Sequence, residues 1–307
     1  MKNENDMKKI VLLGLIGLLI GGSVQAQLLY KISGKDLKNS SYLIGTHHLA
    51  PVTFVDSIPG LKEALNDCKQ VYGELDMMDL MKPENLAKMQ AAQMMPEGKT
   101  ISELLTKEQM DRLNEVMREV MGVDMNNEAA GEQLNKLSPA ALSTTLSMMA
   151  TMKRIPGFNI ADPFDGYFQK VALAAGKTVK GFETVEFQME VLFGASLEDQ
   201  VKDLMCQVEH FSESLEMMDF ITTAFFAQDL EQLGELFQEE MEEGPCTDGP
   251  EENAKLIDDR NVNWLKQMPG IMEEAPTFFA VGAGHLVGEK GLLNQLREMG
   301  YKVEGVK

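Results

Sequence analysis

The chain contains the sequence YLIGTHH at residues 42–48 and the sequence FFAVGAGH at residues 278–285. Each is an apolar run that ends in a Gly-x-x-His motif, a pattern that predicts a buried strand followed by a turn carrying a histidine. Three of the four histidines of the chain, His47, His48 and His285, follow these two runs. Because α/β folds place their chemistry at the carboxyl ends of strands, we expect the functional site at these two turns.

Apolar and turn-forming residues elsewhere predict further strands that alternate with helices. The expected strands cover residues 28–32, 41–45, 70–75, 178–182, 277–281 and 301–306. Strand, helix and strand follow one another over residues 41–75, an order that favours parallel strands. The sequence therefore predicts an α/β fold with a mixed, largely parallel sheet core and flanking helices.

Residues from about 83 to 152 predict helices without a clear strand. Thr106 and Gln109 form a capping-box pair ahead of an amphipathic stretch, and Ser138 followed by Pro139 is typical of a helix start. We expect this block to be a helical insertion, or lid, within one domain that covers residues 27–307. Further helices are expected at residues 162–175, at 197–238 with a break near Gly234, at 251–267 and at 291–299.

The first 26 residues have the pattern of a secretory signal. Lys8 and Lys9 precede an apolar run at residues 10–20, and the small-residue sequence VQA follows at residues 24–26. This pattern predicts cleavage near Ala26 and an exported protein, either periplasmic or secreted. The apolar run is shorter than the roughly 18 residues that span a bilayer, so no membrane span is expected in the mature chain.

The chain is strongly acidic, with 48 Asp and Glu residues against 28 Lys and Arg residues and a net charge of −20. Such a surface repels phosphate backbones, so nucleic acid is not an expected partner. An oxidising compartment would allow one disulfide among the three cysteines. Cys206 lies in a predicted helix and Cys246 in a Gly-rich loop. Cys206–Cys246 is our first choice of pair.

Two carboxylates, Glu74 and Glu183, lie at the ends of two other predicted strands. Imidazole nitrogens and carboxylate oxygens are ligands for a divalent ion, with one position left for water. His48, His285, Glu74 and Glu183 are therefore the predicted metal ligands, and histidines that only stabilise the fold are the alternative. Successive residues of an extended segment point to opposite faces, so His47 is expected to be at most an alternate ligand.

Six segments, taken together, resemble the TraB/GumN family, which includes the TIKI-type proteases. They are YLIGTHHL at residues 42–49, GELD at 73–76, GFNIAD at 157–162, KGFET at 180–184 with Gln188, DRNVNW at 259–264 and VGAGHL at 281–286. The resemblance implies a TIKI/TraB-like, erythromycin-esterase/ChaN-like fold and metal-dependent peptide cleavage, with Mn²⁺ or Co²⁺ as the ion. On the matching positions, the two motif histidines are His48 and His285, and the glutamate after the early strand is Glu74. Other segments are matched by Asp162, Glu183, Arg260 and Asn261.

These observations predict an exported metal-dependent hydrolase, a peptidase acting on a peptide or protein, although ester hydrolysis remains open. The ion would acidify a bound water, and Glu74 would serve as a ligand or as the general base. Arg260 would bind a substrate carboxylate or the developing oxyanion, unless it forms an ion pair with an acidic neighbour such as Glu183. A non-catalytic protein that binds haem, a metal or a peptide is the alternative from a different class. The sequence indicates neither the substrate nor the oligomeric state.

Overall fold

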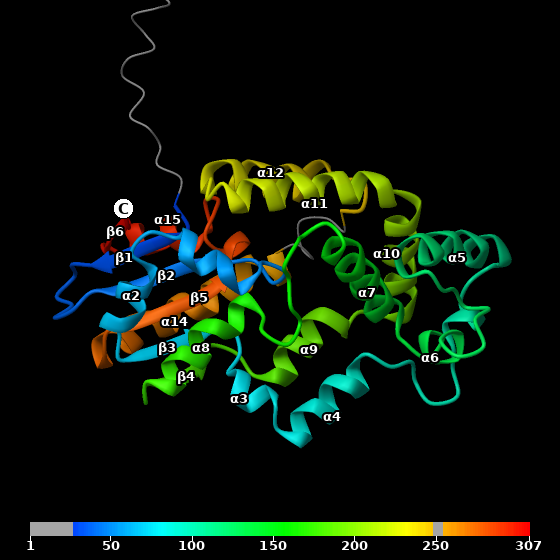
Figure 1. The fold of residues 1–307 in the computed structure, drawn as a ribbon, viewed down its shortest axis with the longest axis horizontal. Helices are drawn as coiled ribbons and strands as arrows, with labels where there is room; N and C mark the ends of the chain where they lie inside the picture. The colour runs from blue at the N-terminus through cyan, green and yellow to red at the C-terminus, as the bar shows by residue number, and fades with distance from the viewer. Residues whose placement is uncertain (1–26, 248–253) are drawn as a thin grey trace, which may run out of the picture.

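The fold is built on a six-stranded sheet with the strand order β4-β3-β5-β2-β1-β6 (Figure 1). The computed structural model describes residues 27–247 and 254–307, so the expected signal segment lies outside the described residues. The strands are β1 (Leu29–Ser33), β2 (Ser41–Thr46), β3 (Gln70–Gly73), β4 (Thr178–Gly181), β5 (Thr277–Gly282) and β6 (Lys302–Gly305). The pairs β2–β5, β5–β3 and β3–β4 are parallel, whereas β1 runs antiparallel to both β2 and β6. The prediction of a mixed, largely parallel sheet is confirmed.

The central strand β5 separates β2 from β3. The strand–helix–strand order predicted over residues 41–75 is present, with α2 (Leu61–Asp67) between β2 and β3. These two strands are parallel, but each pairs with β5 and not with the other. Five of the six residues of β5 are buried, as expected for a strand with neighbours on both edges and helices on both faces.

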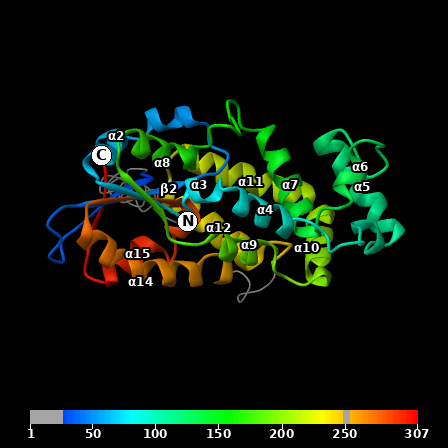
Figure 2. The ribbon, with the colours of Figure 1, turned by 90° about the horizontal axis from the view of Figure 1, so that it is seen from below.

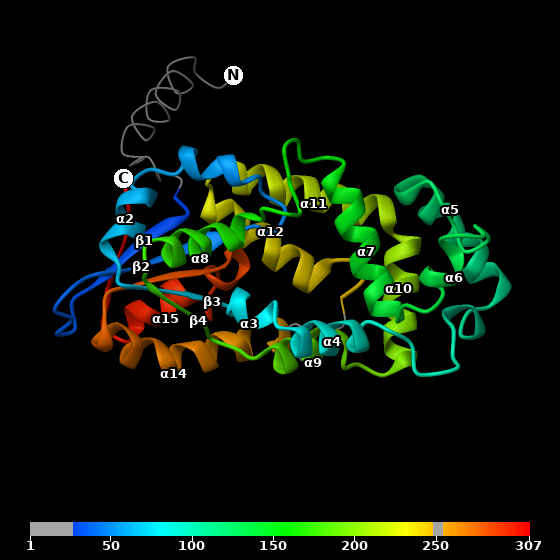
Figure 3. The same cartoon turned by 60° about the horizontal axis from the view of Figure 1, so that its bottom comes forward.

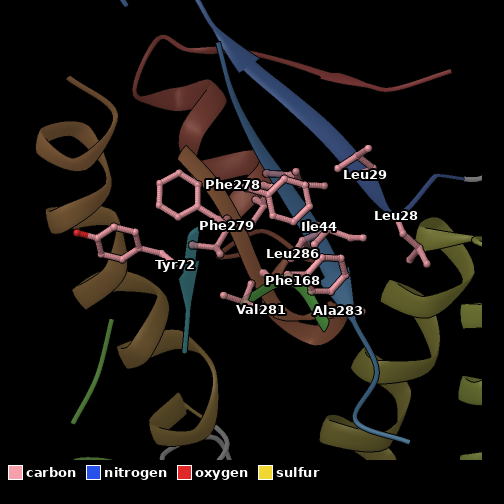
Figure 4. Packing of buried hydrophobic residues seen from close by; sticks show 14 of the residues in the cluster. Leu28, Leu29, Ile44, Tyr72, Phe168, Phe278, Phe279, Val281, Ala283 and Leu286 are labelled. Atoms are coloured by element: carbon pink, nitrogen blue, oxygen red, sulfur yellow. The ribbon is translucent and has the colours of Figure 1, made fainter. Parts of the chain in front are cut away.

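Two layers of helices cover the sheet, with α14 (Asp258–Glu274) and α15 (Leu292–Glu298) on one side and α2 and α8 (Phe164–Ala174) on the other (Figure 2). Adjacent residues of β5 point to opposite faces. Phe278 stacks on Phe168 of α8, with ring centroids 5.3 Å apart, and Phe279 stacks on Phe182 at 5.5 Å. Figure 4 shows Phe168, Phe278 and Phe279 in this core. Phe182 in turn stacks on Trp264 of α14 at 5.3 Å, so Phe278 and Phe279 connect the central strand to helices on both faces.

A second, helical core lies at the far end of the molecule from the sheet (Figure 3). It is formed mainly by α5 (Lys107–Met121), α7 (Pro139–Met152) and α10 (Leu197–Glu209). The remaining elements are η2 (Val52–Ser57), α3 (Met77–Leu80), α4 (Pro83–Ala92), η3 (Ile101–Glu103), α6 (Gly131–Leu134), α9 (Val185–Phe193), α11 (Phe211–Phe226), α12 (Leu230–Glu243) and η4 (Ala283–His285). The expected insertion at about 83–152 thus contains helices α4 to α7, and α10 from outside that range completes its core. Its role as a lid remains a prediction.

Several helix boundaries differ from those expected from the sequence. The helical stretch 197–238 breaks after residue 209 and after residue 226, and α12 continues through Gly234. A side chain at Gly234 would approach the Cβ of Val287 to 3.3 Å, so this glycine allows close packing and does not end the helix. Helix α14 continues past Pro269 to Glu274, and Met268, Ile271 and Met272 on either side of the proline are buried in the main core. Helix α9 had no sequence prediction.

Among the helices of the described ranges, none is long and apolar enough to cross a membrane. A disulfide joins Cys206 in α10 to Cys246 beyond α12, with Cα atoms 5.7 Å apart and a sequence separation of 40 residues. The sequence-based choice of this pair is confirmed. Cys68 is a buried free thiol, and burial raises its pKa to about 12.

The two Gly-x-x-His motifs lie side by side, because Gly45 pairs with Val281 and Thr46 pairs with Gly282 across the parallel strands β2 and β5. A Cβ atom on Gly45 would lie 3.1 Å from both Cα and Cβ of Ala283. Glycine is needed at this position because the backbone of one motif packs directly against the other.

The double variant Cys206→Ser/Cys246→Ser is expected to lose roughly 3–4 kcal/mol of unfolding free energy, because a loop of this length is no longer closed in the unfolded chain. Urea unfolding followed by circular dichroism measures the loss. A reducing agent should lower the stability of the wild-type protein and leave the double variant unchanged. Equal stability of the two proteins without reductant would contradict the prediction.

The variant Gly45→Val is expected to destabilise the protein by about 1–3 kcal/mol, because its side chain would overlap Ala283. Gly270→Ala is the matched control, since a Cβ at that helical position meets no atom within 4 Å. The control should be neutral or more stable by up to about 1 kcal/mol. Thermal unfolding compares the variants, and a Gly45→Val protein as stable as wild type would refute this packing argument.

Candidate functional site

The carboxyl ends of the parallel strands β2, β5, β3 and β4 meet at one edge of the sheet. His48 follows β2, Glu74 follows β3, Glu183 follows β4 and His285 follows β5 within η4. A hollow of about 240 Å³ opens at this edge. Its polar lining consists of His48, Glu74, Asp165, Gln169 and Gln188. The two histidine motifs and the early glutamate of the sequence prediction thus converge in space.

Glu74 is held from three directions. One carboxylate oxygen accepts a hydrogen bond from the backbone N–H of Gly282 at 2.9 Å. The other accepts from Arg260 at 2.5 Å and from Gln188 at 3.3 Å. Burial favours the neutral acid, but the positive charge of Arg260 and the hydrogen bond from Gly282 favour the carboxylate, and the pKa of Glu74 is lowered. Glu74 is therefore an ionised carboxylate, fixed in part by the first glycine of the second motif.

Arg260 on α14 is buried at the centre of this network, with 7% of its surface exposed. A guanidinium carries five N–H donors. Those of Arg260 meet both oxygens of Glu183 at 2.8 and 2.9 Å, Glu74, the carbonyl of Leu256 at 3.2 Å and the ring of His285 at 3.2 Å. Each donor thus has an acceptor within the protein. The ion pair with Glu183, one of the two sequence interpretations of Arg260, is present.

Glu183 accepts a third hydrogen bond, from the indole N–H of Trp264 at 2.9 Å. Its side chain is 4% exposed. Arg260 and Trp264 together occupy both of its oxygens, and the buried Trp264 ring also lies against His285 at a centroid distance of 4.3 Å. Glu183 therefore faces Arg260, behind Glu74.

His285 is buried, and its orientation is fixed by Asn261. The amide nitrogen of Asn261 donates to the carbonyls of His285 and Lys290, so its oxygen is left to accept from Nδ1 of His285 at 2.8 Å. The opposite nitrogen, Nε2, then carries the lone pair. It lies 3.2 Å from Arg260 and 3.9 Å from a carboxylate oxygen of Glu74. Burial lowers the pKa of His285 to about 4, so the ring is neutral at physiological pH.

His48 occupies the outer side of the hollow, where three quarters of its side chain is exposed. Its Nδ1 lies 3.1 Å from a carboxylate oxygen of Asp165, and the other oxygen of Asp165 accepts from the hydroxyl of Thr46. The charge of Asp165, together with the hydrogen bond between Asp165 and His48, raises the pKa of His48 to about 9. His47, by contrast, packs against Phe225 at a centroid distance of 5.2 Å, and burial lowers its pKa to about 4.

Asp165 is the site residue that the sequence analysis missed. That analysis considered Asp162, which the structure places in an ion pair with Lys170 at 2.9 Å. The helix begins after Pro163, so Asp165 lies in its first turn. An acidic residue in a first helical turn is commonly explained by the helix dipole, which hides any further role. The sequence feature that could have pointed to Asp165 is Thr46, its hydrogen-bond partner, which lies inside the first Gly-x-x-His motif.

The chemistry of the donors fits a divalent ion in part. His48 and His285 supply imidazoles, Glu74 supplies a carboxylate, and a buried hydrogen bond to the second ring nitrogen is typical of metal-binding histidines. Glu183 fits less well, because Arg260 and Trp264 bind its oxygens. Within residues 27–247 and 254–307, no three His, Cys, Asp or Glu side chains lie close enough together to hold an ion. Arg260 forms hydrogen bonds with two of the proposed metal ligands, Glu74 and His285.

The fold and the site define an α/β protein with paired Gly-x-x-His turns and an ionised glutamate at the carboxyl edge of its sheet. The model of the TraB/PrgY/gumN family matches residues 28–305, and the chain belongs to this family. No solved structure matches the chain.

Curated relatives include three proteins named as metalloproteases. Metalloprotease TIKI2 of Danio rerio is 24% identical over 305 residues, which cover 86% of this chain and 58% of the relative. Metalloprotease TIKI1 of Homo sapiens is 24% identical over 86% of this chain and 59% of its own length. A metalloprotease TIKI homolog of Nematostella vectensis is 24% identical over 87% of this chain and 65% of its own length. The chain therefore spans about three fifths of the length of these relatives.

Asp165→Asn is expected to lower the pKa of His48 from about 9 toward the ordinary histidine value near 6.5, because the carboxylate no longer stabilises the imidazolium. NMR titration of the histidine ring protons, with a chelator present, measures the shift. Asp162→Asn is the matched control, since Asp162 pairs with Lys170 and should leave His48 unchanged. An unshifted His48 in the Asp165 variant would exclude the proposed pairing.

Proposed function

We propose that this protein is an exported metal-dependent hydrolase that cleaves peptide bonds at the hollow lined by His48 and Glu74, with the buried His285 next to Glu74. The observation that carries the proposal is that His48 and Glu74, from two parallel strand ends, line one small hollow, while Nε2 of His285, from a third strand end, lies 3.9 Å from the carboxylate of Glu74. The metalloprotease relatives support the reaction class. The disulfide supports an oxidising compartment and hence export.

In this proposal His48, His285 and Glu74 would hold the ion, with Mn²⁺ or Co²⁺ as the proposed metal. The bound ion would acidify a water molecule and polarise the scissile carbonyl. His285 is suited to its part because Asn261 keeps the proton on Nδ1 and Nε2 is left as the donor atom. His48 would have to give up its proton, since a metal ligand must be deprotonated. Metal affinity should therefore rise with pH.

Glu74 is proposed either as a ligand or as the base that receives the proton of the attacking water. Its ionised state and its fixed position, set by Gly282 and Gln188, suit both roles. Arg260 would have to release Glu74 and His285 before these donors could turn to the ion. It could then stabilise the developing oxyanion, whereas Glu183 would join as a ligand only if Arg260 moved further.

A protein that binds haem, a metal or a peptide without turnover is the second candidate. The volume of the hollow, about 240 Å³, lies below the roughly 300–1,000 Å³ of pockets for drug-sized ligands. This size favours an ion and one substrate residue over a macrocycle. Ester hydrolysis would use the same groups. Assays with peptide and with ester substrates distinguish the two reactions.

The first test is cleavage of a mixture of unstructured peptides by the metal-depleted protein, before and after addition of Mn²⁺ or Co²⁺, with products identified by mass spectrometry. We expect cleavage only after metal is added. Calorimetric titration of the same protein measures metal affinity independently of turnover. A wild-type protein that binds metal without cleaving peptides or esters would favour the binding protein, and one that binds no metal would exclude both metal proposals.

Removal of a proposed ligand is expected to lower metal affinity by more than roughly 100-fold, because loss of a group behind the ligands already costs 10–100-fold. His48→Ala tests the exposed ligand, and His285→Gln preserves volume in the buried position. His210→Ala is the control, because His210 contacts Glu213 on another surface at 3.0 Å. Circular dichroism checks that each variant is folded. Unchanged Mn²⁺ and Co²⁺ affinity in both His48 and His285 variants would refute the site assignment.

A further inference from the structure

One wall of the hollow is apolar. Leu75, Met77 and Leu80 line it, together with Pro163 and Ala280, whereas His48, Glu74 and Asp165 belong to the polar side. Met77 and Leu80 come from the short helix α3, which directly follows the turn that carries Glu74. Glu74 and this apolar wall are thus only a few residues apart in the chain and border the same small space.

Helix α3 is held in place by polar contacts at its N-terminal end. The side chain of Asp76 accepts hydrogen bonds from the backbone of Met78 at 2.9 Å and of Asp79 at 3.3 Å. Gln169 of α8 bonds both sides of the turn, accepting from the N–H of Met77 at 2.9 Å and donating to the carbonyl of Leu75 at 2.8 Å. The apolar wall therefore has a fixed backbone.

Gln169 also connects this wall to the other half of the site. It lies one helical turn after Asp165 on α8, the residue that contacts His48. A Cβ atom on Gly73 would lie 2.4 Å from the amide nitrogen of Gln169, so the end of β3 accepts this side chain only because residue 73 is glycine. One helix thus positions both the histidine side and the apolar side of the hollow.

The size and lining of the hollow limit what can enter it. A space of about 240 Å³ is large enough for one side chain and too small for several. An acidic side chain placed against Leu75, Met77 and Leu80 would lose its hydration without gaining a basic partner on that wall. Met77 adds an adaptable surface, since methionine has a flexible and polarisable side chain.

We propose that Met77 and Leu80 form a subsite for a large apolar side chain of the substrate, in the residue next to the bond that is cleaved. This inference rests on the proposed peptidase function and names its substrate class: peptides with a leucine-like or aromatic residue beside the scissile bond, and not with an acidic one. The apolar wall contributes by removing that side chain from water, and the polar wall faces the adjacent peptide bond.

The test uses three peptides that are identical except for one central residue, which is Leu, Ala or Glu. Binding of each peptide to the full-length protein is measured by calorimetry without turnover, in the presence of a chelator, and cleavage is measured separately with Mn²⁺. We expect the Leu peptide to bind and to be cleaved about 10–100-fold better than the Ala peptide, and the Glu peptide to be the poorest. Equal binding of the three peptides would overturn the subsite.

Leu80→Asn should reduce the advantage of the Leu peptide to less than about threefold, because the apolar contact is lost while the Ala peptide has little contact to lose. Met81→Asn is the matched control, since Met81 is the next residue of the chain, is 60% exposed and lies outside the lining of the hollow. The control should retain the full preference. An equal loss of preference in both variants, or in neither, would contradict the assignment. Selective binding without any cleavage would preserve the subsite and reject the peptidase function.

Discussion

A buried guanidinium holds the site together. Arg260 joins α14 to the ends of β3 and β4 and to the turn after β5, because Glu74, Glu183 and His285 all accept its N–H groups. A charge removed from water is tolerated only when its hydrogen-bonding groups have partners. Burial of Arg260 is therefore stable only while these acceptors stay in place around it. A change in one acceptor alters the hydrogen bonds that Arg260 makes to the others.

The close contact between the two motifs has a similar effect on the backbone. Gly45 leaves room for Ala283, and the N–H of Gly282 binds Glu74. The first glycine of each motif thus acts on the opposite strand and not on its own histidine. Sheet register, backbone contact and the position of the glutamate consequently depend on one another, and the contact with Ala283 explains why glycine is needed at position 45.

Much of this arrangement could be predicted from local patterns. The apolar runs before Gly45 and Gly282 predict the two strands, and their motifs indicate His48 and His285. The insertion of β5 between β2 and β3 could not be deduced in this way, because pairing between residues so far apart leaves no periodic signal in either segment. The sequence likewise offered two interpretations of Arg260, since only the folded chain shows how many acceptors surround it.

The central position of β5 also has a consequence for the order of events during synthesis. Strands β2 and β3 are made early and have β1 and β4 as earlier neighbours, but each finds its second neighbour only when residues 277–282 have appeared. Until then β2 and β3 lack the strand that joins them, and long-range pairing of this kind is slow to form. The sheet therefore closes only after the ribosome has translated most of the chain, so its folding is largely post-translational.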